Sequence, residues 1–226
     1  MIISYRHRFI FFAVPKTGTH SVRRALRIHL GPEDLEQVGL YGDRRFPFPE
    51  LAAIRHGHLS AREIAPVIGA DVFGEFFKFA FVRNPYARFV SYCAFMGRKT
   101  GRFEHEPIRF MKHIVKNVRP VDHVLYRPQS SLLVNTQGEL AIDFIGRSET
   151  MQSSWDAVCA RIGLPAGILD TVNTSSHGDY RQYYDDELRD LVGTLYRSDL
   201  DLFNYEFETP SPQPAQDTVG ATARAG

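Results

Sequence analysis

The sequence has no long apolar segment and few cysteines, and both absences exclude classes of protein. Its longest apolar run, Phe9–Val14, has six residues, whereas a membrane-spanning helix needs about 20, so we expect no stable membrane insertion. No small-residue cleavage site follows this run, so we predict no signal peptide. The two cysteines, Cys93 and Cys159, form no CxxC motif. This excludes a disulfide framework and a cysteine zinc site, and favours a reducing, cytoplasmic location.

The length and composition are those of an ordinary globular domain. The chain has 226 residues, of which 43% are hydrophobic and 23% charged, so a disordered, collagenous or coiled-coil protein is not indicated. We predict one domain over residues 1–209. The last residues, 210–226, are rich in Pro and Ala and have few large apolar side chains. They predict a disordered tail.

Two short apolar runs, each followed by a helical pattern, predict the organisation of the domain. Phe9–Val14 and Phe76–Val82 are rich in Phe and are typical of buried strands in a parallel sheet. A helix is expected from Ser21 to Gly31, and another from Pro85 to about Met96, with Asn84 as its cap. The alternation predicts an α/β domain with a mostly parallel sheet, whose ligand lies at the carboxyl ends of the strands.

Further elements are expected along the rest of the chain. Residues 33–58 show little periodicity and predict a long irregular excursion. Ser60 and Glu63 form a capping box that begins a short helix, which Pro66 disturbs. Helices are also predicted over residues 106–118, 153–162 and 185–200, and a strand near residues 141–145.

Positive charge is concentrated in two blocks, although the formal net charge is only +1. Residues 1–30 contain six Lys or Arg and no acidic residue, and residues 83–119 contain nine against two. The blocks are either two solvated helix faces or the two sides of one anion-binding site.

The loop after the first strand has the composition of an anion site. It reads PKTGTHS over residues 15–21. Gly18 allows a tight turn, and the amides that begin the next helix favour an anion. Lys16 and the hydroxyls of Thr17, Thr19 and Ser21 add donors. The order GxxxxGK[ST] of a Walker A loop is absent, so the loop predicts a phosphate or sulfate cradle of another kind.

The second loop also offers donors for an anion. It begins RNPYARFVSY at Arg83, so Arg83 leaves the end of a strand and Ser91 lies on the following helix. Arg88 and Ser91 are three residues apart and share a helix face. A guanidinium and a hydroxyl together suit a phosphate monoester. Arg88 serves either there or in a surface ion pair.

These two loops resemble motifs of the sulfotransferases that use 3′-phosphoadenylyl sulfate (PAPS). PKTGTHS is similar to their 5′-phosphosulfate loop, and RNPxxRxxSY to their 3′-phosphate motif. The order of further segments resembles the carbohydrate-type sulfotransferase family 2, and the HGH of residues 56–58 resembles that of heparan 2-O-sulfotransferases. Later segments that fit are RPQSSLL, DFIGRSE and LYRSDLDLFNYEF. The resemblance covers about residues 1–207 and implies a three-layer fold like that of the P-loop kinases.

The resemblance also implies roles for particular residues. The 5′-phosphosulfate would be bound by Lys16, Thr17, Gly18, Thr19, His20 and Ser21, and the 3′-phosphate by Arg83 and Ser91. Family members commonly have a small residue where His20 stands. The acceptor would be a hydroxyl of a carbohydrate or glycolipid. A histidine suits the role of its base, so we assign His58, with His56 as the alternative, and Lys16 to stabilise the developing charge.

Other interpretations stay open at this stage. Arg147 either approaches the nucleotide or pairs with Glu149, and the aromatic residues Phe144, Trp155, Tyr180, Tyr183, Tyr184 and Tyr196 are interpreted as packing residues. An ATP-dependent small-molecule kinase would also use a lysine-bearing loop, but no GK[ST] and no evident magnesium carboxylate is found. A non-catalytic anion-binding or nucleic-acid-binding module is the other alternative. Nucleic acid favours a more extended basic surface, so we expect no nucleic acid as a ligand. The sequence contains no metal-binding cluster, so we expect no metal either.

Overall fold

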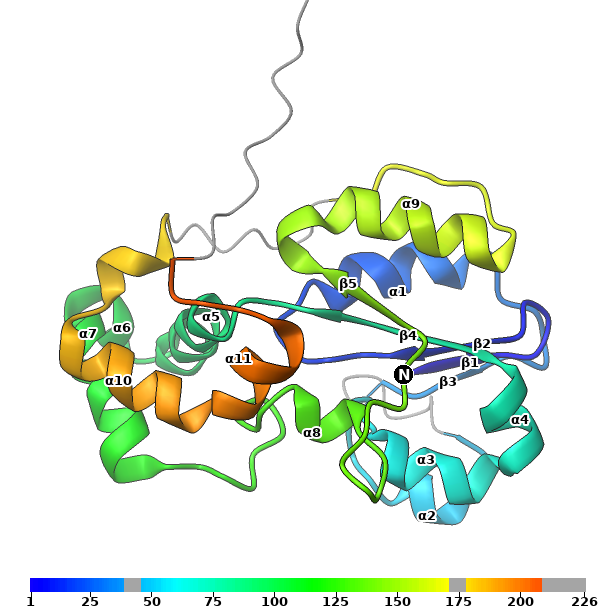
Figure 1. The fold of residues 1–226 in the computed structure, drawn as a ribbon, viewed down its shortest axis with the longest axis horizontal. Helices are drawn as coiled ribbons and strands as arrows, with labels where there is room; N and C mark the ends of the chain where they lie inside the picture. The colour runs from blue at the N-terminus through cyan, green and yellow to red at the C-terminus, as the bar shows by residue number, and fades with distance from the viewer. Residues whose placement is uncertain (39–45, 171–177, 209–226) are drawn as a thin grey trace, which may run out of the picture.

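The structure is a computed structural model that describes residues 1–38, 46–170 and 178–208. Its centre is a five-stranded sheet in the order β3-β1-β2-β4-β5, shown in Figure 1. The strands are β1 Ile2–Ser4, β2 Phe9–Phe12, β3 Leu35–Glu36, β4 Phe77–Val82 and β5 Phe144–Arg147. β2, β4 and β5 are parallel neighbours, and β1 is antiparallel to both β2 and β3. Because β1 alone is reversed, the sheet is mostly parallel, which confirms the predicted α/β class.

The two apolar runs form adjacent strands that are buried on both faces. Alternate residues of β2 point to opposite sides. Phe9 and Phe11 pack with the helices α1 (Thr19–Arg27) and α9 (Met151–Ile162), and Ile10 and Phe12 belong to the larger core on the other face. All four are almost completely buried. This is why the run lacks the polar alternation of a strand with one solvated face.

The helices complete three layers. In Figure 1, α1 and α9 cover one face of the sheet, and α2, α3, α4 and α8 lie on the other side. A further group, α5, α6, α7, α10 and α11, continues from the carboxyl end of β4. The bounds are α2 Pro49–Ala52, α3 Ala61–Ile68, α4 Ala70–Glu75, α5 Pro85–Gly97, α6 Arg102–His105, α7 Pro107–His113, α8 Ser130–Leu133, α10 Asp186–Leu195 and α11 Arg197–Phe203. A π-helical turn spans Ile114–Val118, and 3-10 turns span Ser148–Thr150 and Tyr180–Tyr183.

Several local predictions are confirmed. Ser60 and Glu63 form the capping box of α3, and the Asn84 side chain accepts from the Tyr86 amide with Pro85 in the first turn of α5. α9 ends at Gly163, which adopts φ 70°. The aromatic residues interpreted as packing lie in or against the cores: Phe144, Trp155, Tyr180, Tyr183, Tyr184 and Tyr196.

Other boundaries were predicted wrongly. The helix expected over residues 185–200 is divided at Tyr196, whose buried hydroxyl donates to the Tyr126 carbonyl at 2.8 Å. The strand expected near residues 141–145 lies at Phe144–Arg147, and α3 continues two residues beyond Pro66. The excursion contains β3 and α2, although its residues 39–45 lie outside the described residues. The predicted tail, residues 210–226, also lies outside them.

Candidate active site

The two predicted loops lie at the same edge of the sheet. β2 and β4 are paired in parallel, with Phe12 opposite Ala80. The loop after β2 and the residue after β4 therefore leave neighbouring strands at their carboxyl ends. β5 contributes from the same edge, since the Ser148 hydroxyl donates to the Thr17 carbonyl at 2.9 Å. Three parallel strands thus bring the sequence-predicted segments together.

The first loop has a tight backbone shape. Lys16 has φ 69° and Gly18 has φ 84°, and a left-handed lysine is uncommon and costs about 1 kcal/mol. A Cβ atom on Gly18 would lie 2.5 Å from Cε of Met151. The Thr17 side chain is fully buried, and its hydroxyl donates to the Val14 carbonyl at 2.9 Å. The Thr17 hydroxyl thus stabilises the shape of the loop, and its proton is used in the hydrogen bond to Val14.

The helix that follows begins with open backbone donors. Gly18 is the N-cap of α1, no side chain caps the helix, and its first turn holds no acidic residue. The amide of Ser21 donates to the Gly18 carbonyl at 3.1 Å, whereas the amides of Thr19 and His20 have no acceptor in the described part of the chain. Such amides and the helix dipole favour an anion.

Two cations face this edge without an acidic partner in the described ranges. Nζ of Lys16 lies 4.6 Å from the ring centroid of Phe95, and burial together with the nearby Arg83 lowers the pKa of Lys16 to about 8. Burial likewise lowers the pKa of Arg83, against the opposing charge of Glu149. Glu149 forms no ion pair with Arg83 in the described ranges; its oxygens accept from the Asn84 amide at 2.6 Å and the Tyr205 hydroxyl at 2.8 Å.

The two predicted residues of α5 differ in their surroundings. Ser91 is 7% exposed, and its hydroxyl has no hydrogen-bond partner within the described residues. Arg88 is 1% exposed and donates to the Leu125 carbonyl at 3.0 Å and to the Arg127 carbonyl. The surface ion pair considered for Arg88 is therefore wrong, and its guanidinium is hydrogen-bonded to two backbone carbonyls.

The HGH segment reaches the first loop through His58. Nδ1 of His58 lies 2.6 Å from the Ala13 carbonyl oxygen. A carbonyl only accepts, so Nδ1 carries the proton and Nε2 has the lone pair. Burial lowers the pKa of His58 to about 3, which keeps the ring neutral at pH 7. Nδ1 of His56 accepts from the His58 amide at 3.3 Å, so Nε2 of neutral His56 is the protonated nitrogen.

His20 lies in the first turn of α1 and is exposed. Partial burial of its imidazole lowers its pKa, and the charges of Arg23, Lys16 and Arg27 lower it further. An anion in the loop would act in the opposite direction and favour the protonated imidazole.

Arg147 has a structural position. It donates to the Phe203 carbonyl at 2.7 Å, and its guanidinium carbon lies 4.4 Å from the ring centroid of Tyr205. It forms no ion pair with Glu149 in the described structure, so the pairing with Glu149 is wrong.

Two residues near the site have no role predicted from the sequence. Phe95 is 50% exposed beside Lys16 and lies one helical turn after Ser91, a spacing that the sequence itself shows. Gln129 belongs to the RPQSSLL segment, and its fully buried amide contacts the backbone of Arg83. Only the three-dimensional structure places Gln129 there.

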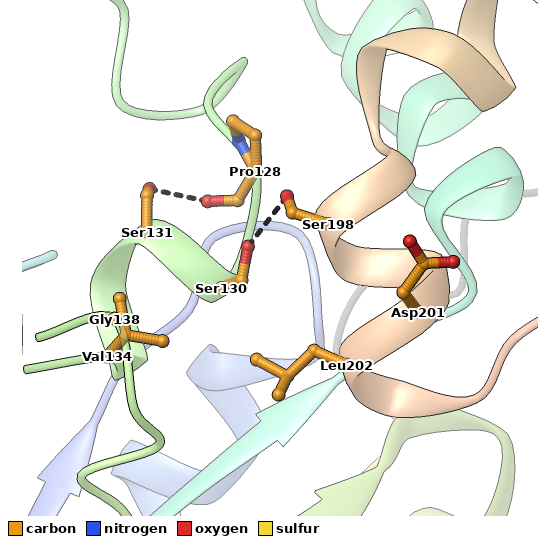
Figure 2. A pocket seen from close by; sticks show the side chains of 8 residues that line it. All are labelled: Pro128, Ser130, Ser131, Val134, Gly138, Ser198, Asp201 and Leu202. Carbon is orange, nitrogen blue, oxygen red and sulfur yellow. Dashed lines mark hydrogen bonds between the residues drawn. The ribbon is translucent and has the colours of Figure 1, made fainter.

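A separate pocket of about 520 Å³ lies between α8 and α11, as Figure 2 shows. Its lining residues are Pro128, Ser130, Ser131, Val134, Gly138, Ser198, Asp201 and Leu202. It includes none of the sequence-predicted site residues. Within the described ranges, no cluster of three or more His, Cys, Asp or Glu is arranged for a metal ion. No described helix combines the length and apolar character that a membrane span requires.

Comparison with protein families identifies one match. The model of the sulfotransferase family matches residues 1–206, a range that includes both loops and the HGH segment. The comparisons with curated proteins and with solved structures give no match.

Proposed function

The chain belongs to the sulfotransferase family, whose members transfer sulfuryl groups, and we propose that it uses PAPS to sulfate a hydroxyl of a carbohydrate or glycolipid. The observation that carries the choice of donor is the pair of cations, Lys16 and Arg83. They lie at one sheet edge beside the open amides of α1, and neither has an acidic partner among the described residues.

The residues at this edge fit a nucleotide with two anionic groups. Lys16 and the amides of α1 would hold the 5′-phosphosulfate, and Arg83 with the Ser91 hydroxyl would hold the 3′-phosphate. Gly18 supports this assignment, because its left-handed turn shapes the backbone before the open amides. Thr17, Thr19, His20 and Ser21 complete the loop around the 5′-group. When bound, PAPS supplies an activated sulfuryl group on a phosphate leaving group.

His58 is better suited than His56 to be the base. The bond from Nδ1 of His58 to the Ala13 carbonyl fixes the ring and leaves the Nε2 lone pair for a proton. Neutral His56 uses its lone pair to accept from the His58 amide. Its remaining nitrogen is a donor, which would suit hydrogen bonding to the acceptor or the sulfuryl oxygens.

The reaction is an in-line displacement that these residues would assist at two atoms, the acceptor oxygen and the departing phosphate oxygen. The acceptor oxygen forms a bond to sulfur as the bond from sulfur to the phosphate oxygen breaks. Nε2 of His58 takes the hydroxyl proton. Lys16 and the loop amides stabilise the charge that grows on the departing phosphate oxygen. The products are the sulfated hydroxyl, adenosine 3′,5′-bisphosphate and a protonated His58.

The acceptor would lie between the excursion over residues 33–58 and the basic stretch that follows Met96. In that stretch Arg98, Lys99 and Arg102 are exposed and have no ion pair with a described residue. Their charge would tolerate an acidic sugar. A screen of neutral and acidic glycans tests the acceptor class. We also propose a cytoplasmic location, which the free and buried Cys93 and Cys159 support.

Thermal unfolding tests the donor site. Adenosine 3′,5′-bisphosphate at 100 times its Kd adds about 2.7 kcal/mol, which raises the Tm by about 5–11 °C for a chain of this size. We expect this rise for the wild type and its loss in Arg83→Ala, with little rise from ADP or AMP. Arg24→Ala is the control, because Arg24 is exposed and pairs with Asp170 at 3.4 Å.

Equal rises with ADP and the bisphosphate would contradict the assignment of the 3′-phosphate to Arg83 and favour a kinase. A rise that Arg83→Ala retains in full would exclude Arg83 from the site. No rise with any of the nucleotides would contradict the proposed donor.

A further inference from the structure

The Arg83 guanidinium has no partner in the described part of the protein, so its position depends on how its backbone is held. Lys16 repels this cation and burial disfavours its charge, while the charge of Glu149 attracts it without forming an ion pair. We propose that Gln129 is a positioning residue that fixes Arg83 for an anionic ligand. This role rests on the proposed function, because the ligand in question is the 3′-phosphate of a nucleotide.

Gln129 contacts both peptide groups of Arg83. Its Oε1 accepts from the Arg83 amide at 2.9 Å, and its Nε2 donates to the Arg83 carbonyl at 2.8 Å. The strand pairings of β4 end at Val82. The side-chain amide therefore acts as a substitute for a neighbouring strand and continues the pairing by one residue.

Asp199 fixes the Gln129 end of this contact. The carboxylate is 0% exposed and accepts from the backbone amides of Gln129 and Ser130, both at 2.8 Å. The same carboxylate lies 3.3 Å from Nε2 of Gln129. The hydroxyls of Ser130 and Ser198 lie 3.0 Å apart, as Figure 2 shows. Together these contacts fasten the start of α8 to α11.

The segment before Gln129 is held from α5 itself. Arg88 donates to the carbonyls of Leu125 and Arg127, and the Tyr196 hydroxyl donates to the Tyr126 carbonyl. These contacts form a closed circuit of residues. Arg83 immediately precedes α5, Arg88 of α5 holds the segment before Gln129, and the Gln129 side chain hydrogen-bonds the Arg83 backbone. This closure explains why Arg88 is buried.

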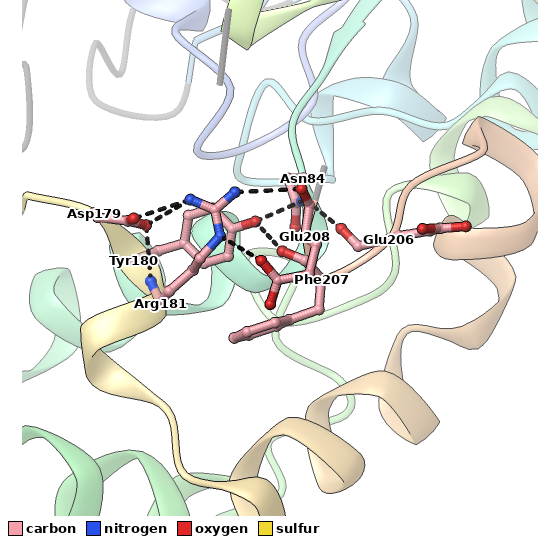
Figure 3. A network of polar contacts seen from close by, with 7 residues as sticks. All are labelled: Asn84, Asp179, Tyr180, Arg181, Glu206, Phe207 and Glu208. Atoms are coloured by element: carbon pink, nitrogen blue, oxygen red, sulfur yellow. Dashed lines mark hydrogen bonds and ion pairs between the residues drawn. The ribbon is translucent and has the colours of Figure 1, made fainter. Parts of the chain in front are cut away.

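A different network holds the next residue. The Asn84 amide donates to Glu149, and its side chain donates to the Glu206 carbonyl at 2.9 Å and the Tyr180 hydroxyl at 3.3 Å, part of which Figure 3 shows. Among the described residues, Gln129 alone hydrogen-bonds the peptide groups of Arg83. Its loss should therefore affect Arg83 more than the rest of the loop.

The test compares two ligands that differ by one phosphate. Isothermal titration measures the Kd of adenosine 3′,5′-bisphosphate and of 5′-AMP for the wild type, Gln129→Met, Arg83→Met and the double variant. Met has a similar length but makes no hydrogen bond. Ser130→Ala is the control, because it removes a hydroxyl contact of α8 and leaves the backbone contacts with Asp199 and the Gln129 side chain in place.

We expect Gln129→Met to weaken bisphosphate binding about tenfold and to change AMP binding less than twofold. In the Arg83→Met background, Gln129→Met should change neither Kd further, because the two residues act as one unit. Ser130→Ala should keep the wild-type ratio of the two affinities. Should Gln129→Met fail to fold, Asp199→Asn replaces it with a smaller expected loss of the same ratio.

Three results would overturn this role. Equal weakening of both ligands would mean that Gln129 supports the whole fold, and additive effects in the double variant would mean that it does not act through Arg83. Unchanged Kd values for both ligands would mean that Arg83 needs no such support. If the wild type itself does not prefer the bisphosphate, the proposed function fails together with this role.

Discussion

The partly buried His58 should make the folded protein less stable in mild acid, and one substitution should remove this effect. The ordinary pKa of histidine is about 6.5, and burial lowers that of His58 to about 3 in the folded protein. Between these values the unfolded chain binds a proton that the folded protein excludes, so stability increases with pH. The contribution is unchanged above about pH 7 and becomes increasingly unfavourable as the pH falls through 6.5 towards 3.

The size of the effect follows from the unfolded pKa alone while the pH stays well above 3. One proton gives a slope of about 1.4 kcal/mol per pH unit. From pH 7 to pH 5 the wild type should therefore lose about 2 kcal/mol through His58. His58→Gln has no titrating group, and its amide is able to donate to the Ala13 carbonyl as Nδ1 of His58 does.

Urea unfolding at pH 7, 6 and 5 measures this difference. The quantity compared is the change in unfolding free energy with pH, so a constant loss of stability in His58→Gln does not affect the result. His105→Gln is the control, because His105 is exposed on α6. An acid-induced loss in His58→Gln within about 0.5 kcal/mol of the wild-type loss would refute the reasoning.

Two further predictions concern turnover and the loop backbone. His58→Ala should abolish sulfuryl transfer and leave the Kd of adenosine 3′,5′-bisphosphate within about twofold of wild type, measured by product assay and titration; retained turnover would remove His58 as the base. Gly18→Ala should lower the free energy of unfolding by about 1–2 kcal/mol and weaken the binding of adenosine 3′,5′-bisphosphate. Gly163→Ala is its control in unfolding and titration, because Gly163 has φ 70° and no atom lies within 4 Å of an added Cβ. Equal bisphosphate binding in the two glycine variants would contradict the role of the loop.

The parts of the fold that sequence predicted are those that local physics determines. The runs around Phe11 and Phe79 are apolar on both faces because both faces are covered, and the capping box at Ser60 uses only neighbouring residues. β1 was not predicted, because a strand of three residues is too short to show a periodic pattern of apolar residues. The break between α10 and α11 at Tyr196 was not predicted, because the Tyr126 carbonyl that its hydroxyl contacts is 70 positions away in the sequence.

The candidate site likewise combines features that follow from local sequence with features that depend on distant residues. Lys16, Gly18 and Arg83 follow strands in the sequence, so their common edge was predictable from the parallel sheet. Arg88 shares a helix face with Ser91 in the sequence, but the carbonyls that occupy it belong to residues 125–127. Helical spacing gives the direction of a side chain along its own helix and not the identity of the segment packed against it.

The surroundings of His58 and Lys16 give these two titratable side chains different protonation states at pH 7. Burial lowers the pKa of His58 to about 3 and that of Lys16 to about 8. At pH 7 the imidazole is therefore neutral, and the ammonium keeps its proton in about nine of ten molecules. The neutral imidazole has the free lone pair that the proposed base needs, and a pKa of about 3 makes it a weak proton acceptor until the anionic donor beside it raises that pKa. The charged ammonium suits the proposed stabilisation of a departing phosphate oxygen. His58 and Lys16 thus have opposite protonation states at pH 7, which is the arrangement that the proposed roles of base and charge stabiliser require.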